Sequence, residues 1–134
     1  RLAIALMEKY VGEKTGTRND KGGTFNGGEG QMDCIDESIN TSMYLTMFQN
    51  FGLMRWHRIQ DRATRGWFIF GGWPHTTAVI SATGLLGEGE GRHWVVDSWF
   101  LDNGELPYIL PLEQWKSGWW PSREVTQPDA GSIR

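Results

Sequence analysis

The chain contains one cysteine, Cys34, and three histidines, His57, His75 and His93. A thiol becomes a strong nucleophile when it loses its proton, and an imidazole is the side chain that accepts this proton near neutral pH. A single cysteine cannot form a disulfide within the chain, nor can it supply a four-thiolate zinc site. These residue types therefore indicate nucleophilic thiol chemistry, provided that one imidazole reaches the thiol.

Cys34 directly follows Asp33, a residue type that caps the N-terminus of helices. The unpaired N–H groups and the positive dipole end of a helix stabilise a thiolate. Asp36 and Glu37 place negative charge on the same predicted turn, however, and this charge disfavours the thiolate. Cys34 is therefore either a nucleophile with a cationic partner or a small buried residue at a helix start.

The position of Asp97 indicates which histidine is part of the site. Asp97 lies among Val, Trp and Phe residues on a predicted strand, so it needs a hydrogen-bond partner if it is buried. His93 lies about 13 Å away along the same strand, beyond hydrogen-bond reach. A hairpin centred on Leu86 would instead place His75 directly opposite Asp97, with about 4.5 to 5.5 Å between the Cβ atoms. We therefore predict that Asp97 orients His75 and that His75 activates Cys34.

The order of these three residues resembles the transglutaminase-like superfamily, which has a papain-like core. The similarity covers positions 31 to 100 and lies in three segments, Gln31-Met32-Asp33-Cys34, Trp73-Pro74-His75-Thr76 and Trp94-Val95-Val96-Asp97. The resemblance implies that Cys34 is the nucleophile, that His75 is the general base and acid, and that Asp97 orients the imidazole. Ile35 stands where the vertebrate members have an aromatic residue, so the resemblance favours a bacterial cysteine peptidase or amidase over a crosslinking enzyme.

Three further residues are candidate parts of the site. Gln31 lies three positions before Cys34, where its amide could join the Cys34 backbone N–H in binding an oxyanion; otherwise it is an ordinary polar loop residue. Trp73 and Trp99 flank the site and could bind the substrate's acyl chain; otherwise they pack in the core. No HxH or HxxxH spacing accompanies Cys34, so we expect neither a metal nor a cofactor.

Two helices are predicted before the first strand. Residues 1–11 have an apolar face at helical spacing, formed by Leu2, Leu6 and Tyr10. Residues 12–30 are rich in Gly, Thr and Asn and are predicted as a loop. Residues 33–51, which end at Gly52, form a predicted central helix. We expect its apolar stripe to pack on a sheet together with the small residues beside it; the stripe consists of Ile35, Ile39, Met43 and Met47.

Segments rich in aromatic and β-branched residues then predict strands at Leu53–Ile59, Trp67–Phe70, His75–Ser81 and His93–Phe100. Because no helix is predicted between them, we expect an antiparallel sheet of three to four strands. A turn at 102–107 and a short helix at Leu112–Trp115 follow. The fold class is therefore predicted to be α+β, and the resemblance implies a papain- or transglutaminase-like core with the nucleophile at the N-terminus of a helix packed on the sheet.

The length of 134 residues and the 39% of hydrophobic residues predict a single domain over 1–134. We divide it into a helix and Gly-rich loop (1–30), a catalytic core (31–120) and a polar tail (121–134). The net charge of −3 comes without a basic cluster, which argues against a nucleic-acid partner. No apolar stretch approaches the roughly 20 residues that cross a bilayer, so we expect no membrane span.

These features predict a peptide or protein substrate and hydrolysis of a peptide or isopeptide amide through a thioester at Cys34. Two alternatives stay open. One is transfer of the acyl group to an amine, as in a transglutaminase, and the other is an inactive module that binds a peptide or glycan with some of its eight tryptophans. The chain begins at Arg1, so we expect a trimmed or processed piece. The compartment stays open; it would be the cytoplasm or periplasm of a bacterium if a targeting segment was removed. The oligomeric state is left open.

Overall fold

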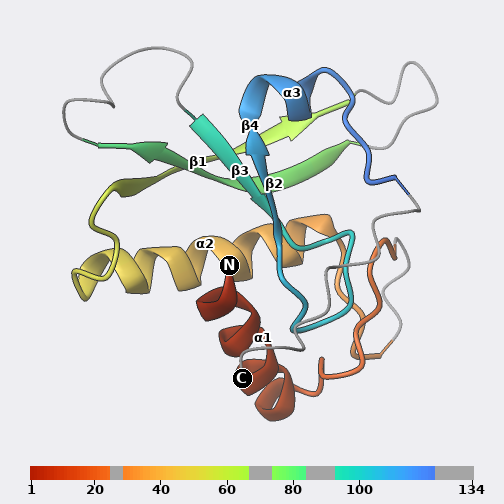
Figure 1. The fold of residues 1–134 in the computed structure, drawn as a ribbon. Helices are drawn as coiled ribbons and strands as arrows, with labels where there is room; N and C mark the ends of the chain where they lie inside the picture. Colours follow the sequence, from red (N-terminus) through yellow and green to blue (C-terminus); the bar gives the residue numbers. More distant parts are fainter. Residues whose placement is uncertain (25–28, 67–73, 84–92, 123–134) are drawn as a thin grey trace, which may run out of the picture.

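Four strands form one antiparallel sheet in which every strand lies next to its neighbours in the sequence, in the order β1-β2-β3-β4 (Figure 1). They are β1 (His57–Arg65), β2 (His75–Ala82), β3 (His93–Asp97) and β4 (Tyr108–Pro111). This arrangement comes from a computed structural model that describes residues 1–24, 29–66, 74–83 and 93–122. Together with the helices, it confirms the predicted α+β class with an antiparallel sheet.

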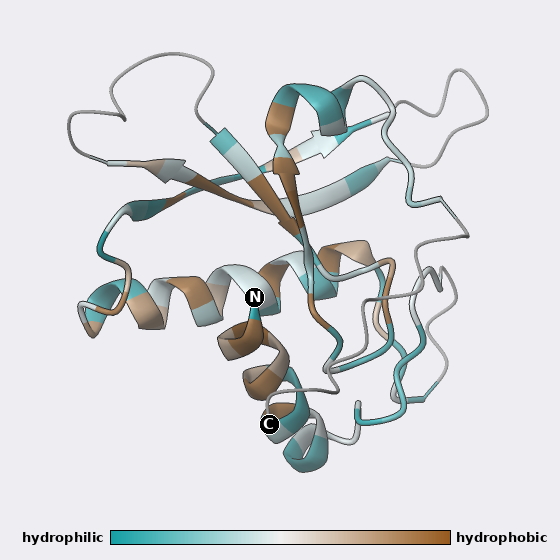
Figure 2. Cartoon of the chain, viewed as in Figure 1, coloured by the Kyte–Doolittle hydropathy of each residue, from teal (hydrophilic) through white to brown (hydrophobic). Residues whose placement is uncertain are grey.

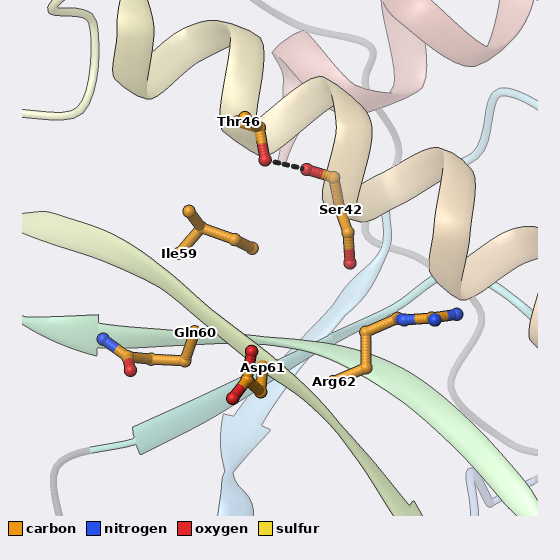
Figure 3. Close-up of a pocket in the computed structure, with 6 residues that line it drawn as sticks. All are labelled: Ser42, Thr46, Ile59, Gln60, Asp61 and Arg62. Atoms are coloured by element: carbon orange, nitrogen blue, oxygen red, sulfur yellow. Dashed lines mark hydrogen bonds between the residues drawn. The ribbon is translucent and has the colours of Figure 1, made fainter.

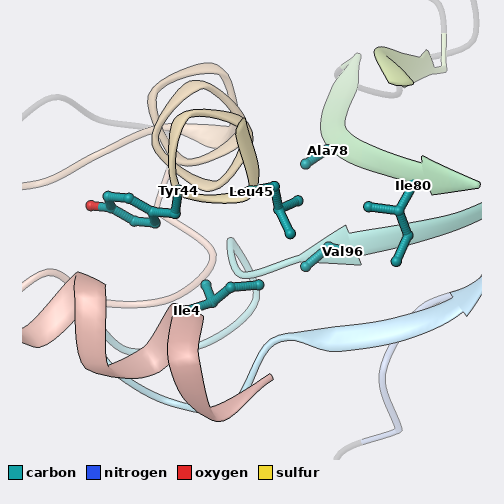
Figure 4. Close-up of a cluster of buried hydrophobic side chains, with 6 residues drawn as sticks. All are labelled: Ile4, Tyr44, Leu45, Ala78, Ile80 and Val96. Carbon is teal, nitrogen blue, oxygen red and sulfur yellow. The ribbon is translucent and has the colours of Figure 1, made fainter. Parts of the chain in front are cut away.

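Helices cover both faces of the sheet (Figure 1). They are α1 (Leu2–Thr15), α2 (Cys34–Asn50) and α3 (Leu112–Lys116). The α2 helix crosses one face and packs with α1 over a buried cluster formed by Ile4, Tyr44, Leu45, Ala78, Ile80 and Val96 (Figure 4). The short α3 helix closes the other face, over Val79, Val95, Leu110 and Trp115. Alternate residues of β2 and β3 thus belong to different clusters, as the pleat of a strand requires.

The start and the end of α2 follow from local sequence. The side chain of Asp33 accepts hydrogen bonds from the backbone N–H groups of Ile35 (2.8 Å) and Asp36 (3.0 Å). These bonds satisfy two donors that a helix leaves unpaired at its N-terminus. At the other end Gly52 has φ +70°, a left-handed conformation that glycine adopts without strain. The predicted helix 33–51 is therefore confirmed to within one residue at each end.

The faces predicted to be buried are wrong in both long helices. In α2 the predicted stripe is 39 to 57% exposed, and the buried residues are Cys34, Glu37, Ser38, Thr41, Tyr44 and Leu45. With 3.6 residues per turn, the two sets lie on nearly opposite sides of the helix. In α1, likewise, Leu2, Leu6 and Tyr10 are exposed. Figure 2 shows hydrophobic positions along both helices, so hydropathy alone does not distinguish the packed face.

The end of α1 lies four residues beyond the prediction, at Thr15. The sequence predicts a loop from Gly12 onwards, but Gly12 is buried within the helix. A Cβ atom at this position would lie 3.2 Å from the backbone of Arg18, so glycine allows close packing here. The helix instead ends at Gly16, which has φ +84°.

The strand predictions are correct only in part. The first strand, β1, begins at His57, four residues after the start of the predicted strand Leu53–Ile59. It is an edge strand with many exposed positions, so its sequence lacks a strong apolar pattern. The sequence did not predict β4, and β3 ends at Asp97 rather than Phe100. The predicted strand Trp67–Phe70 lies outside the described residues. The short helix after β4 is confirmed as α3, and no helix within the described ranges is both long and apolar enough to cross a membrane.

Candidate active site

Cys34, His75 and Asp97 meet at one end of the sheet. Cys34 is the first residue of α2, His75 is the first residue of β2, and Asp97 is the last residue of β3. Because β2 and β3 are antiparallel, the start of one strand and the end of the other lie at the same end of the sheet. All three residues are buried, with 7%, 5% and 2% of their surfaces exposed. The structure therefore brings together the three predicted residues.

His75 and Asp97 are joined by a hydrogen bond of 2.7 Å between Nε2 and Oδ2. The register that we predicted for this pair is wrong by two residues, because Val79 pairs with Val95 and Asp97 therefore lies diagonal to His75, not opposite it. Side chains alternate between the faces of a sheet, so a shift of two residues leaves both on the same face, and a diagonal neighbour is within reach of long side chains. The predicted turn around Leu86 lies outside the described residues.

Trp115 is a part of the site that the sequence analysis missed. Its indole N–H donates a hydrogen bond of 2.8 Å to the same Asp97 oxygen that binds His75, and its side chain is fully buried. The guanidinium of Arg65 stacks on the indole ring, 4.5 Å from its centroid, and donates to the Trp115 carbonyl oxygen. Two donors thus hold the Asp97 carboxylate in one orientation. The sequence signal was only that Trp115 lies in a predicted short helix.

Replacing Trp115 with phenylalanine should therefore destabilise the protein. Phenylalanine keeps an aromatic ring in the core, but Asp97 loses a buried donor and a small cavity opens. We expect the free energy of unfolding to fall by about 2 to 3 kcal/mol, as measured by urea denaturation. Trp120→Phe is the matched control, since Trp120 is 62% exposed and its loss should cost little. Equal losses in the two variants would contradict this role of Trp115.

The second ring nitrogen of His75, Nδ1, is buried and has no hydrogen-bond partner among the described residues. Burial acts to lower the pKa of His75, but interactions with Asp97 and with the neighbouring Cys34 thiol outweigh it and raise this pKa above its usual value. The Cys34 sulfur also lies 3.7 Å from the Pro74 carbonyl oxygen, directly before His75. Since Nε2 is engaged by Asp97, Nδ1 is the nitrogen left to take the thiol proton.

Aromatic rings enclose the imidazole. The ring centroids of Trp99, Phe100 and Trp115 lie 4.7, 5.0 and 5.4 Å from that of His75. Trp99 is buried, and its indole N–H donates to the carbonyl oxygen of Thr24 at 3.1 Å. Trp99 therefore packs against His75, and its role in binding an acyl chain stays a prediction. Trp73, the other predicted substrate-binding residue, lies outside the described residues.

Gln31 has both ends of its side-chain amide engaged with the segment before it. Its Oε1 accepts the backbone N–H of Lys21 at 3.0 Å, and its Nε2 donates to the carbonyl oxygen of Asn19 at 3.1 Å. These bonds fasten residues 19–21 to the segment that leads into Cys34. The predicted role of Gln31 as an oxyanion donor stays a prediction, and no hydrogen bond of its side chain supports it.

The pocket drawn in Figure 3 lies away from these residues, between α2 and β1. It has a volume of about 400 Å³ and is lined by Ser42, Thr46, Ile59, Gln60, Asp61 and Arg62. In the described part of the chain, no group of His, Cys, Asp and Glu side chains has an arrangement suited to a metal ion. The groups that meet at the end of the sheet are a thiol, an imidazole and a carboxylate.

Comparisons of the chain with models of protein families, with curated proteins and with solved structures found no match. The case for a transglutaminase-like site therefore consists of the sequence motifs and of the geometry of Cys34, His75 and Asp97.

Proposed function

We propose that the protein is a thiol-dependent acyl-transfer enzyme of the transglutaminase-like type, which hydrolyses a peptide or isopeptide amide through a thioester at Cys34. The observation that supports this most is the environment of the His75 ring. Nε2 is bound to Asp97, whereas Nδ1 is buried without a hydrogen-bond partner in the described ranges, and the Cys34 thiol is beside the ring. A general base needs one nitrogen oriented by a carboxylate and the other available for a proton.

In the first half of the proposed reaction, the proton of the Cys34 thiol moves to Nδ1 of His75. The thiolate attacks the carbonyl carbon of the amide, a C–S bond forms, and the carbonyl π electrons move to the oxygen. When this intermediate collapses, the C–N bond breaks and His75 donates its Nδ1 proton to the leaving amine. The products are a free amine and an acyl group bound to Cys34 as a thioester.

In the second half, water attacks the thioester while Nδ1 of His75 takes a proton from it. The C–S bond then breaks, and the proton returns to the Cys34 sulfur as the carboxylic acid leaves. Asp97 keeps the proton of the imidazole on Nε2, so Nδ1 is the nitrogen that exchanges protons in both halves. The raised pKa of His75 favours the imidazolium that accompanies the thiolate.

The reactivity of Cys34 towards iodoacetamide tests the activated thiol. At pH 6 we expect alkylation at least about tenfold faster than that of free cysteine, because His75, oriented by Asp97, can take the thiol proton. Mass spectrometry measures the rate. Asp97→Asn should slow the reaction at this pH, whereas Asp36→Asn, an exposed carboxyl on the same turn as Cys34, should not. An alkylation rate equal to that of the urea-unfolded chain would argue against an activated thiol.

The acyl acceptor can be identified with an activated ester such as p-nitrophenyl acetate. An acyl group retained on Cys34, located by mass spectrometry, would demonstrate the thioester. Release of acetate alone supports hydrolysis, whereas transfer to an added primary amine supports the transglutaminase alternative. If Cys34 shows neither acylation nor fast alkylation, the inactive peptide- or glycan-binding module becomes the better description.

A further inference from the structure

Three carboxyl groups from separate parts of the chain are buried close to one another. They belong to Glu8 of α1, Asp20 of the segment between α1 and α2, and Glu37 on the first turn of α2, and each residue is only 3 to 4% exposed. Within the described residues none of the three forms an ion pair, since the salt bridges there join Lys21 to Asp102 and His75 to Asp97. Buried carboxylates without cations cannot all be ionised, because desolvation and mutual repulsion are too costly.

The hydrogen bonds indicate which group keeps its proton. Asp20 accepts the backbone N–H of Met32 at 2.9 Å, as an ionised carboxylate does. The interaction between the Asp20 and Glu37 side chains acts to lower the pKa of Asp20 and to raise that of Glu37, and two carboxyl groups can share a hydrogen bond only if one of them is protonated. Glu8 accepts the N–H of Gly104 at 3.0 Å. The proton of the pair therefore belongs on Glu37.

The surroundings of Glu37 all favour its neutral form. Burial, then the charge of Glu8 on α1 and the interactions with Asp20 and with Asp97 on β3, raise the pKa of Glu37 to about 9. Tyr44 lies about two turns after Glu37 on α2. Burial and the charges of Glu8 and Glu37 raise its pKa to about 12. Glu37 and Asp97 line the same enclosed space between α2 and the sheet.

We propose that Glu37 is a positioning residue for Cys34. Glu37 stays protonated and donates a hydrogen bond to Asp20. Asp20 in turn accepts the N–H of Met32 and thereby fixes the segment that leads into Cys34. The bonds of Gln31 to Asn19 and Lys21 fasten the same two segments. The inference deepens the proposed function, because Cys34 is its nucleophile. The proton on Glu37 can nevertheless be measured without any activity.

Loss of this proton would act on the site in two ways. The hydrogen bond between Glu37 and Asp20 would be replaced by repulsion, so the segment around Met32 would loosen. A second negative charge would also lie beside Asp97, whose carboxylate orients His75. Both effects would disturb the geometry of the thiol and the imidazole above about pH 9.

Infrared spectroscopy of the carbonyl stretch tests the proton directly. At pH 7 the wild type should show a band of a protonated carboxylic acid that is absent from Glu37→Gln, in which a neutral amide donor replaces the acid. In Asp20→Asn the amide can donate to Glu37 and one negative charge is lost, so the pKa of Glu37 should fall and the band should weaken. Asp36→Ala, which removes an exposed carboxyl from the same turn, should leave the band unchanged. No difference between wild type and Glu37→Gln would overturn the proposal.

The dependence of stability on pH gives a second measurement. The pKa of Glu37 is about 9 in the folded chain and 4.5 when unperturbed, so between these values the folded state holds a proton that the unfolded state releases. Relative to Glu37→Gln, the unfolding equilibrium constant of the wild type should therefore rise by up to about tenfold per pH unit from pH 5 to 9, then level off. Parallel curves for the two proteins would contradict the inference.

Hydrogen exchange at the Met32 amide and alkylation of Cys34 test the positioning role. Glu37→Gln should behave like the wild type, whereas Glu37→Ala should exchange the Met32 amide at least about tenfold faster and react differently with iodoacetamide. If the Met32 amide is as protected in Glu37→Ala as in the wild type, the positioning role of Glu37 is overturned. If this variant does not fold, Asp20→Asn and the infrared band still decide whether Glu37 carries the proton. If Cys34 is unreactive in every variant while the infrared and exchange results hold, the proposed function fails and the role of Glu37 stands.

Discussion

Cys34→Ala is expected to abolish acylation and to reduce turnover of p-nitrophenyl acetate by about 10⁵ to 10⁶-fold, the loss seen when a catalytic nucleophile is removed. The fold should survive, because alanine fits where a small buried residue starts α2, and the hydrogen bond of the sulfur to the Pro74 carbonyl oxygen is long, at 3.7 Å. We expect a stability loss of no more than about 1.5 kcal/mol in thermal or urea denaturation. Release of p-nitrophenol, followed by absorbance, measures the turnover.

The matched control for this experiment is Ser42→Ala. Ser42 is another small residue of α2, but it lines the pocket between α2 and β1 and is distant from the sheet end at which His75 begins β2. Its replacement should leave turnover unchanged. Full turnover in Cys34→Ala would refute the thioester and with it the enzyme hypothesis.

His75→Ala is expected to reduce turnover by about 10⁴ to 10⁶-fold, whereas His57→Ala and His93→Ala should change it by less than about threefold. Of the three histidines, His75 is the one whose side chain is hydrogen-bonded to Asp97 in the described part of the chain. His57 packs edge-on against Trp94, with ring centroids 5.9 Å apart, and His93 begins β3 at the end opposite Asp97. The variant should also lose fast alkylation at pH 6, since no imidazolium then pairs with the thiolate.

His75 is buried, so its replacement needs a check on folding. Circular dichroism and urea denaturation of the three alanine variants provide it, and His75→Asn offers a polar replacement if the alanine variant unfolds. Equal losses of turnover in all three variants at preserved stability would indicate that the imidazoles act together, as ligands of a metal, or only through the structure. Either result would rule out the assignment of His75 as the sole base.

The pairing of His75 with Asp97 could be predicted although the register behind it was wrong. Side chains on a strand alternate with a period of two, so the prediction depended on whether the register was odd or even, and an error of two residues did not change this. An error of one residue would have put the two side chains on opposite faces. The exact pairing of β2 with β3 could not be derived, because it depends on contacts across the whole sheet.

The packed face of α2, in contrast, could not be predicted from the sequence. Two stripes were present in its sequence, one of Ile and Met and one that includes Ser38, Thr41 and Leu45. Hydrophobicity favoured the first, but the second packs on the sheet and the first is exposed. Small residues let the helix approach the sheet closely, and this approach also directs Cys34 inwards at the start of the same face. Only the placement of the sheet could decide between the two.

The sequence by itself determined the residue types available for chemistry and the local signals that begin α2 at Cys34, namely the Asp33 cap and the stop at Gly52. Such signals act over a few bonds along the chain, so they are readable from the order of residues. Only the tertiary structure decided that Trp115 donates to Asp97 and that Asp20 pairs with Glu37. These partners are 18 and 17 positions apart, and burial away from water, which depends on the complete fold, is what makes each contact necessary.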